Sequence, residues 1–311
     1  MMRRSSRVDI AVPTFNDEAT IEATLQSLLQ QTLAPRRIVV VDDGSTDGTT
    51  EIVAGFERCG GVELRRNAKN LGLVGNWNEC IRRCDGDYLL ILHSDDWLHP
   101  TAVSQLDSLL NVTSSLGLIG LGAKFFETPT ESTCTAWSNA EALGEFTVSE
   151  TTPDRIVTAL SLICSSVVVS RRAYEMVGMF SDEFPYSPDE EMWVRISAQW
   201  PIAVRSGGEL VGVRTQGEHY MHQTWCAPDF VNAWRKLHER IDDIARQALD
   251  PQDFHSVHSM MTAKYQNTLK WIAADCKSRG VSVSTRLAWE ANRGAGFRQM
   301  VATVRSLLGL A

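Results

Sequence analysis

The sequence predicts an α/β protein whose mostly parallel sheet is flanked by helices and followed by a helical C-terminal segment. Over about the first 110 residues, short runs rich in β-branched residues alternate with segments of helical periodicity, a pattern typical of parallel sheets. Two of these runs end in paired aspartates. From about residue 226, only helical periodicity continues. We therefore expect one α/β domain over residues 1–225 and a helical extension over residues 226–311.

The hydrophobic pattern predicts the elements of the α/β domain in order. Strands such as residues 37–41 are continuous β-branched runs, whereas the helical segments repeat apolar residues on one face. The expected strands span residues 7–12, 37–41, 61–66, 88–92, 116–126 and 163–169. The expected helices span residues 19–31, 49–57, 73–84 and 190–199. The polar segment 127–150 is expected to be a loop that covers a substrate.

Composition excludes several classes of protein. With 311 residues, 43% of them hydrophobic, the chain can bury a sizeable core. The net charge of −8 argues against nucleic acid as a partner, since such binding depends on clustered Lys and Arg. The seven cysteines form no CxxC pair, which indicates reduced thiols, mostly in the core. The apolar runs are shorter than the ~18 residues that span a bilayer, and VDIAV is too short for a signal peptide, so we expect a cytoplasmic protein.

The paired acids Asp42-Asp43 and Asp95-Asp96 each follow a predicted strand. Ligands of open parallel sheets bind at the carboxyl ends of the strands, so these side chains are expected to face one crevice. One carboxylate there can accept from a base N–H, and another can hold a hard cation against a diphosphate. The alternative is a polar turn that only caps a helix.

Four motifs, in fixed order over about 100 residues, resemble those of family 2 glycosyltransferases with the GT-A fold. They are PTFND at 13–17, VDDGSTDGT at 41–49, NLGLVGNWN at 70–78 and GDYLLILHSDDWL at 86–98. The order and spacing of the set are more specific than any single motif. The resemblance extends from residue 7 to about residue 215, and it implies an inverting transfer of sugar from a nucleoside-diphosphate-sugar donor.

The resemblance also implies roles for individual residues. Asp43 corresponds to the acid that reads the base edge, and Asp96 to a ligand of Mg²⁺ or Mn²⁺ that would neutralise the departing diphosphate. Asp95 corresponds to a ribose contact that could also reach the metal. The other positions expected to contact the donor are Pro13, Phe15, Asn16, Asn70, Gly72, Asn78 and Arg214. Asn70 could instead only cap the helix that follows it.

Two positions depart from the family's usual pattern. His93 stands where an Asp is usual, so metal affinity could be lower, or the ring could simply pack at the end of its strand. Gln216 stands where a His is usual. His219 or His222 could take its place as a phosphate or metal contact, although HxxH spacing also occurs on ordinary loops and helices.

The acceptor side of the site is expected at SPDEEMWVRIS, residues 187–197, which resembles the family's acceptor motif. An inverting transfer needs one general base to remove the acceptor proton, and the resemblance assigns this role to Asp189. Glu190 and Glu191 are rivals for the role. The three acids could also serve only the helix dipole in the first turn.

The expected enzyme transfers one sugar per encounter, because QxxRW and membrane helices, the marks of processive relatives, are not found. Its acceptor would be a glycan, a lipid-linked sugar or a small molecule, in cell-surface polysaccharide or other glycoconjugate synthesis. The amphipathic segment 297–308 could contact the inner membrane face, and a homodimer is another expectation. Two alternatives stay open: a nucleotidyltransferase that makes a nucleotide sugar, and a non-catalytic glycan-binding relative.

Overall fold

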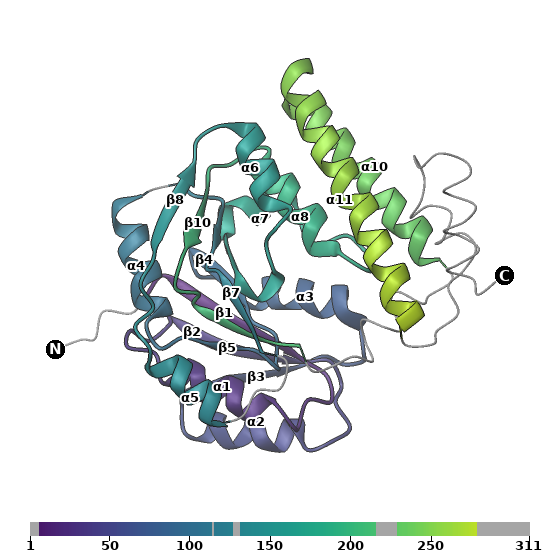
Figure 1. Cartoon of the computed structure of the whole chain (residues 1–311). Helices are drawn as coiled ribbons and strands as arrows, with labels where there is room; N and C mark the ends of the chain where they lie inside the picture. The colour runs from purple at the N-terminus through teal and green to yellow at the C-terminus, as the bar shows by residue number, and fades with distance from the viewer. Residues whose placement is uncertain (1–5, 114, 127–130, 216–228, 279–311) are drawn as a thin grey trace. The chain divides into compact units, whose positions relative to one another are not determined.

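The computed structural model describes residues 6–113, 115–126, 131–215 and 229–278 (Figure 1). The chain divides into two compact units. The N-terminal unit comprises residues 1–182 and 192–216, and the C-terminal unit comprises residues 183–191 and 217–311. Sequence reasoning did not anticipate that a short segment near residue 187 groups with the C-terminal helices. The boundary expected at residue 225 lies outside the described residues.

The N-terminal unit is built on an eight-stranded sheet with the order β3-β2-β1-β4-β9-β6-β10-β8. Its strands are β1 (Val8–Thr14), β2 (Arg37–Asp42), β3 (Glu63–Arg66), β4 (Tyr88–Ile91), β6 (Leu118–Gly120), β8 (Glu145–Ser149), β9 (Val167–Ser170) and β10 (Ile202–Ser206). Strands β3, β2, β1 and β4 are mutually parallel, as are β6 and β10. Only β9 and β8 run antiparallel to their neighbours. The expected α/β fold with a mostly parallel sheet is confirmed.

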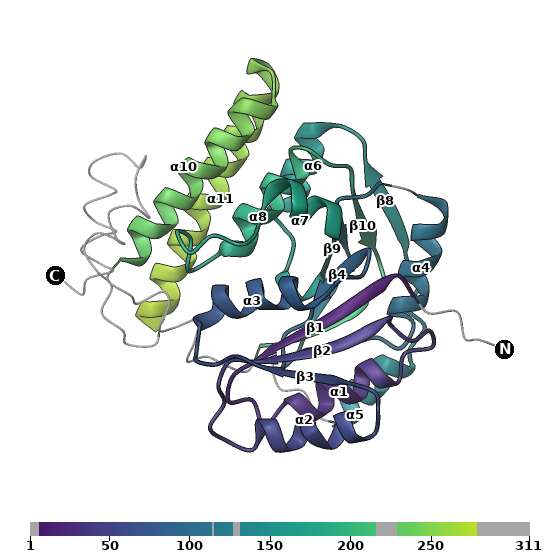
Figure 2. The same cartoon turned by 180° about the vertical axis from the view of Figure 1, so that it is seen from behind.

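Helices cover both faces of the parallel strands (Figures 1 and 2). Because side chains alternate along a strand, one face of β1, β2 and β4 packs on α1 and α4 and forms the main core. Helix α3 lies on the opposite face and buries Val74, Trp77 and Cys80. These helices and others of the N-terminal unit are α1 (Ile21–Leu29), α2 (Thr49–Arg58), α3 (Gly72–Arg83), α4 (Ala102–Val112), α6 (Thr152–Ala159) and α7 (Arg171–Val177).

A second, three-stranded sheet lies in the same unit, with the order β5-β11-β7. It comprises β5 (Trp97–Leu98), β7 (Ala123–Phe126) and β11 (Val211–Arg214). The register pairs Gly212 with Trp97, and a Cβ on Gly212 would lie 2.5 Å from the indole, so only glycine fits here. Because β5 begins directly after Asp96, this sheet carries Arg214 to the carboxyl end of β4.

Two expectations for the middle of the chain were wrong. The strand expected over 116–126 is two strands in different sheets, because the chain turns at Gly122, whose φ is 74°. The segment 127–150 is not one loop. Residues 131–139 form helix α5 (Glu131–Asn139), whose Trp137 is buried against Trp97 and Phe126, and β8 pairs antiparallel with β10.

The C-terminal unit contains an αα-hairpin of α10 (Phe230–Ala248) and α11 (Pro251–Ser278), so the described part of the expected extension is helical. The buried stripe of α10 includes Trp234, Leu237 and Ile241. Helix α8 (Pro188–Ser197) contributes its first residues to this unit and the rest to the N-terminal unit. Segment 297–308 lies outside the described residues. Among the helices that are described, none is both long and apolar enough to cross a bilayer.

Candidate active site

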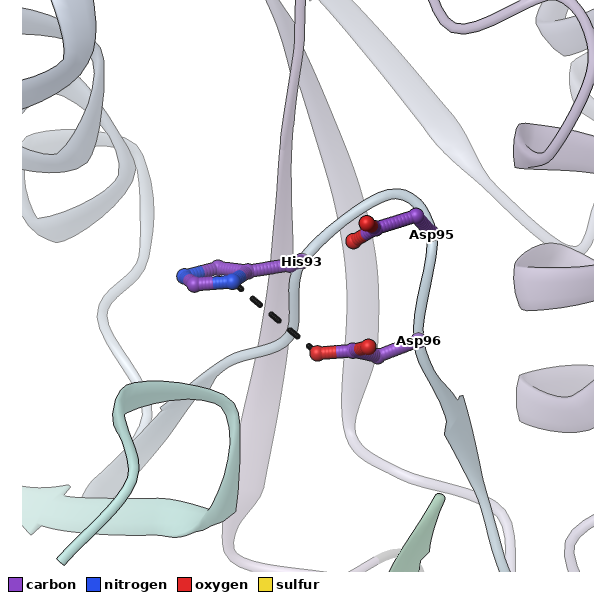
Figure 3. Close-up of side chains that lie close together, drawn as sticks. All are labelled: His93, Asp95 and Asp96. Atoms are coloured by element: carbon purple, nitrogen blue, oxygen red, sulfur yellow. Dashed lines mark ion pairs between the residues drawn. The ribbon is translucent and has the colours of Figure 1, made fainter. Parts of the chain in front are cut away.

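The loop between β4 and β5 carries three side chains with metal-binding groups. His93, Asp95 and Asp96 offer one ligand atom each, and these atoms lie within 4.8 Å of one another. Figure 3 shows the His93 ring and the Asp96 carboxylate facing each other, with the Asp95 carboxylate directed to the same space. A nitrogen and carboxylate oxygens at this spacing can bind one divalent cation. The β4–β5 loop is therefore the candidate metal site.

Buried hydroxyl groups hold this loop in place. The Thr24 hydroxyl on α1 donates to the carbonyl oxygens of Ser94 (2.8 Å) and Asp96 (2.7 Å). The Ser94 hydroxyl donates to Asp17 Oδ2 at 2.6 Å. The same Asp17 oxygen accepts from the Thr14 hydroxyl and from the amide of Phe15. Asp17 thus links the loop after β1 with the β4–β5 loop.

Asp96 is the more deeply buried of the two acids in the loop, with 2% of its surface exposed. Its Oδ1 accepts from the Arg214 amide at 2.9 Å, and it also accepts from the Ser165 side chain. Burial raises the pKa of Asp96 to about 6, against the lowering effect of His93 and with a further increase from the Asp95 charge. Burial likewise raises the pKa of Asp95. Two buried, adjacent carboxylates favour a cation between them.

Replacing Asp96 by Asn should stabilise the metal-free protein. The folded-state pKa of Asp96 is about 6, above the ordinary value of 3.8, so the folded protein favours the protonated acid. The stability contributed by protonated Asp96 is therefore fully present below about pH 4 and is lost as the pH rises through about 6. At about pH 7.5, Asp96→Asn should raise the free energy of unfolding by about 1–3 kcal/mol. Urea denaturation in a chelator, repeated at about pH 5, would measure this gain and its expected decrease. A lower stability at both pH values would contradict the prediction.

His93 lies at the exposed side of the loop and stacks on Trp77 of α3. The ring centroids are 5.4 Å apart with planes inclined by 22°. His93 Nδ1 lies 3.9 Å from Asp96 Oδ2, too far for a hydrogen bond. His93 Nε2 is buried and has no hydrogen-bond partner among the described residues. The aromatic contact, rather than a hydrogen bond, therefore orients the ring.

The loop after β1 displays Phe15 beside the strand-end acids. Pro13 is buried in β1, whereas 47% of Phe15 is exposed, which suits a ring that stacks on a base. Asn16 has φ 59°, a left-handed conformation that Asn adopts more readily than most residues. Its side-chain oxygen accepts from the Thr46 amide and its own amide donates to Ser45, so the loops after β1 and β2 are joined.

Asp43 anchors the start of α3. Its buried carboxylate accepts from the amides of Leu71 and Gly72 and from the Asn67 side chain, at 2.8 to 3.0 Å. Asn70 accepts from the Gly72 amide, the local capping role that was its alternative. Asp42 accepts from turn amides and pairs with Arg66 at 3.1 Å. Contacts of Asp43, Asn70 and Gly72 with a donor stay predictions.

Asp43→Ala should destabilise the protein, because a buried carboxylate that accepts from three protein donors is lost. We expect a loss of about 2–4 kcal/mol in the free energy of unfolding, measured by urea denaturation. Asp43→Asn should lose less, since its remaining oxygen still accepts. Asp47 is less buried than Asp43 and accepts from the amide and hydroxyl of Thr49 at the start of α2, so Asp47→Ala is the matched control and should cost less. An equal loss in both Ala variants would contradict the role of burial.

The Asn78 side chain forms its hydrogen bonds with Phe180 and not with the loops that follow β1, β2 and β4. Its amide donates to the Phe180 carbonyl and its oxygen accepts from the Phe180 amide, both at 3.0 Å. This pair fixes α3 to the turn that follows α7. The structure thus gives Asn78 a structural role, and its contact with a donor stays a prediction.

In the C-terminal unit, the first turn of α8 carries three acids with different surroundings. Glu190 pairs with Lys264 of α11 at 2.6 Å, and Glu191 pairs with Arg240 of α10 at 3.4 Å. Burial raises the pKa of Glu190, against the effect of Lys264. Two of the three candidate bases are therefore held in ion pairs. Asp189 is partly buried in the same turn. His219 and His222 lie outside the described residues.

Sequence reasoning missed three residues that shape the site, namely Asp17, Thr24 and Ser165. Asp17 was within reach, because it ends the PTFND motif that was singled out. Thr24 occupies an ordinary position on the buried face of a helix, and only the fold brings it to the β4–β5 loop. Ser165 lies in the 3-10 turn η1 (Cys164–Ser166), about 70 residues from Asp96 in sequence. Arg214 was named, and the structure places it against Asp95 and Asp96.

Comparison with known proteins identifies this arrangement. The sequence profile described as Glycosyl transferase family 2 matches residues 9–133, the part that contains both acid pairs. Residues 9–133 therefore carry a domain of glycosyl transferase family 2. The family expected for this part of the chain is thus confirmed. The matched residues include the whole β4–β5 loop.

Curated proteins similar to this chain include a glycosyltransferase whose name gives its donor. WfgD of Escherichia coli, a UDP-Glc:alpha-D-GlcNAc-diphosphoundecaprenol beta-1,3-glucosyltransferase, is 26% identical over 193 residues, which cover 61% of this chain and 69% of WfgD. Alignments with three other curated relatives cover 31%, 14% and 35% of those proteins, so the chain spans about a third or less of their length.

Solved structures confirm the GT-A fold. S. aureus TarS 1-349 in complex with UDP-GlcNAc matches with a TM-score of 0.67 and 17% identity, over 97% of this chain and 90% of that chain. The mannosyltransferase PcManGT from Pyrobaculum calidifontis, in complex with GDP-Man and Mn²⁺, matches with a TM-score of 0.55 and 18% identity, over 98% of this chain and 85% of that chain.

Proposed function

We propose that this chain is a metal-dependent, inverting glycosyltransferase that moves one sugar from a nucleoside-diphosphate sugar to a hydroxyl acceptor. The observation that carries the proposal is the β4–β5 loop, where His93, Asp95 and Asp96 converge beside Arg214. The family 2 domain supports the reaction class. The location at the carboxyl end of a parallel strand fits the place where such folds bind nucleotides.

The nucleotide would bind between the loops after β1 and β2. The exposed ring of Phe15 offers a stacking surface for the base. Asp43 would read the base by accepting from a base N–H, in addition to the three protein donors that hold its carboxylate. Uracil, thymine and guanine all offer such an N–H. TarS and PcManGT, whose structures were solved in complex with UDP-GlcNAc and GDP-Man, support a nucleoside-diphosphate sugar as the donor class.

A divalent cation, Mg²⁺ or Mn²⁺, fits the residues present. Asp96 and Asp95 would hold it, and when bound it would supply charge neutralisation for the departing diphosphate. The complex of PcManGT with Mn²⁺ supports this choice. The Arg214 guanidinium, whose Nε donates to the Asp95 carbonyl at 3.2 Å, would add positive charge on the diphosphate side.

Asp189 would remove the proton from the acceptor hydroxyl. Its position in the acceptor motif supports this role, since an inverting transfer needs one general base on the acceptor side. WfgD, whose name specifies a diphosphoundecaprenol-linked acceptor, supports a lipid-linked or other glycan acceptor in cell-surface polysaccharide synthesis. A lipid-linked acceptor would place the protein at the inner membrane face.

A donor screen tests the proposal. The purified chain is incubated with UDP-, GDP- and dTDP-sugars and Mn²⁺, and released nucleoside diphosphate is measured with and without glycan acceptors. We expect release from one donor class, with the anomeric configuration inverted in the product by NMR. Pyrophosphate release from a nucleoside triphosphate and sugar phosphate would instead indicate a nucleotidyltransferase. No turnover and no thermal shift with any nucleotide would indicate a non-catalytic glycan-binding protein.

A further inference from the structure

His93 lies in the β4–β5 loop together with Asp95 and Asp96, and its contacts distinguish it from an ordinary packed histidine. The His93 ring makes two distinct contacts. One ring face stacks on Trp77, while Nδ1 faces the Asp96 carboxylate. Figure 3 shows this edge of the ring directed at the space shared with Asp95.

The distance between His93 and Asp96 fits two ligands of one ion. At 3.9 Å, Nδ1 and Asp96 Oδ2 are too far apart for a hydrogen bond. Two atoms that each lie about 2.1 Å from a cation can be up to about 4.2 Å apart. An ion between the imidazole and the carboxylates would therefore meet ligands without a large movement of the loop.

We propose that His93 is a metal ligand in this chain and that its nitrogen makes the site select a transition metal of the Mn²⁺ class over Mg²⁺. This inference rests on the proposed function and names the metal class of the same site. Mg²⁺ binds oxygen ligands in a strict octahedron, whereas Mn²⁺ and the metals after it also accept imidazole. A site of one imidazole and two carboxylates therefore favours the transition metal.

The stacking on Trp77 allows the nitrogen to be removed while the ring contact stays. His93→Phe keeps an aromatic ring against Trp77 and removes the ligand atom. His93→Asp replaces the nitrogen ligand by an oxygen ligand and should shift the metal preference from Mn²⁺ toward Mg²⁺. His255→Gln removes an exposed histidine of α11 in the other unit and is the matched control for Mn²⁺ held at surface histidines.

The experiment measures metal binding to the full chain directly, without turnover. Electron paramagnetic resonance of free Mn²⁺ gives the Mn²⁺ affinity, and competition gives the Mg²⁺ affinity. We expect His93→Phe to lose about ten-fold or more in Mn²⁺ affinity and much less in Mg²⁺ affinity. His93→Asp should lower the Mn²⁺ to Mg²⁺ affinity ratio, and His255→Gln should leave the ratio unchanged. Pulsed measurements should detect a ¹⁴N nucleus coupled to bound Mn²⁺ in the parent and not in His93→Phe.

Three results would overturn the proposal. One is an unchanged affinity ratio in His93→Phe. Another is the absence of ¹⁴N coupling in the parent, a measurement that does not depend on the folding of any variant. Coupling that persists in His93→Phe would assign the nitrogen to another histidine and would also overturn it. Failure of the glycosyltransferase proposal is distinguishable, because it would appear in the donor screen while the binding data still report on His93.

Discussion

Asp96→Ala is expected to lower kcat/KM for the nucleotide-sugar donor by about 10³-fold or more, the size typical of losing a main electrostatic stabilisation of the leaving group, here supplied by the metal ion that Asp96 would hold. The substitution removes the carboxylate that faces His93 and accepts from the Arg214 amide. Steady-state release of nucleoside diphosphate at saturating Mn²⁺ measures the effect. The variant should remain folded, because it loses a buried charge whose pKa is raised to about 6.

The matched control for this experiment is Asp87→Asn. Asp87 is exposed and directly precedes β4, so it lies at the opposite end of the strand that leads to Asp96. Its substitution should leave kcat/KM within about two-fold of the parent, as is usual for surface changes. If Asp96→Ala turned over donor like the parent, the assignment of the metal site would be wrong.

Asp189→Asn is expected to lower kcat by about 10²–10⁴-fold, the usual contribution of a general base, and to leave the donor KM nearly unchanged. Asn has the shape of Asp but cannot remove a proton. The measurement is kcat and KM with the acceptor at saturation. Slow hydrolysis of the donor by water, which needs no acceptor, provides a second readout in the same preparation.

The neighbouring acids of α8 serve as controls for Asp189. Glu190→Gln and Glu191→Gln break the ion pairs with Lys264 and Arg240 and should lower Tm. At a temperature where each variant is folded, its kcat should match the parent. A large loss of kcat in Glu190→Gln, with Asp189→Asn fully active, would move the catalytic base to Glu190.

Much of the N-terminal fold follows from local pattern. The strands β1, β2 and β4 are continuous apolar runs, and their parallel pairing places the acids that follow them at one edge. The split between β6 and β7 escaped prediction because it depends on a left-handed Gly122 within an apolar run. Strand β8 escaped because its pairing with β10 joins residues more than 50 positions apart.

The candidate site shows the same limit. Acids at strand ends can be read from the sequence, because their position on the chain determines which end of the sheet they reach. The side chains that hold these acids in place cannot be identified from the sequence. Thr24 and Ser165 reach the β4–β5 loop only through the packing of α1 and the turn before β9. The stacking of His93 on Trp77 also depends on how α3 crosses the sheet.

Asp17 gives the donor site a property that neither of its neighbouring loops has alone. One oxygen of this carboxylate accepts from Phe15, on the side expected to meet the base, and from Ser94, on the side expected to meet the metal. A change that shifts either donor alters the geometry of the other through a single atom. A displacement of the Phe15 backbone would therefore be felt at Ser94 in the β4–β5 loop, whereas a change of the Phe15 side chain leaves the shared amide bond in place.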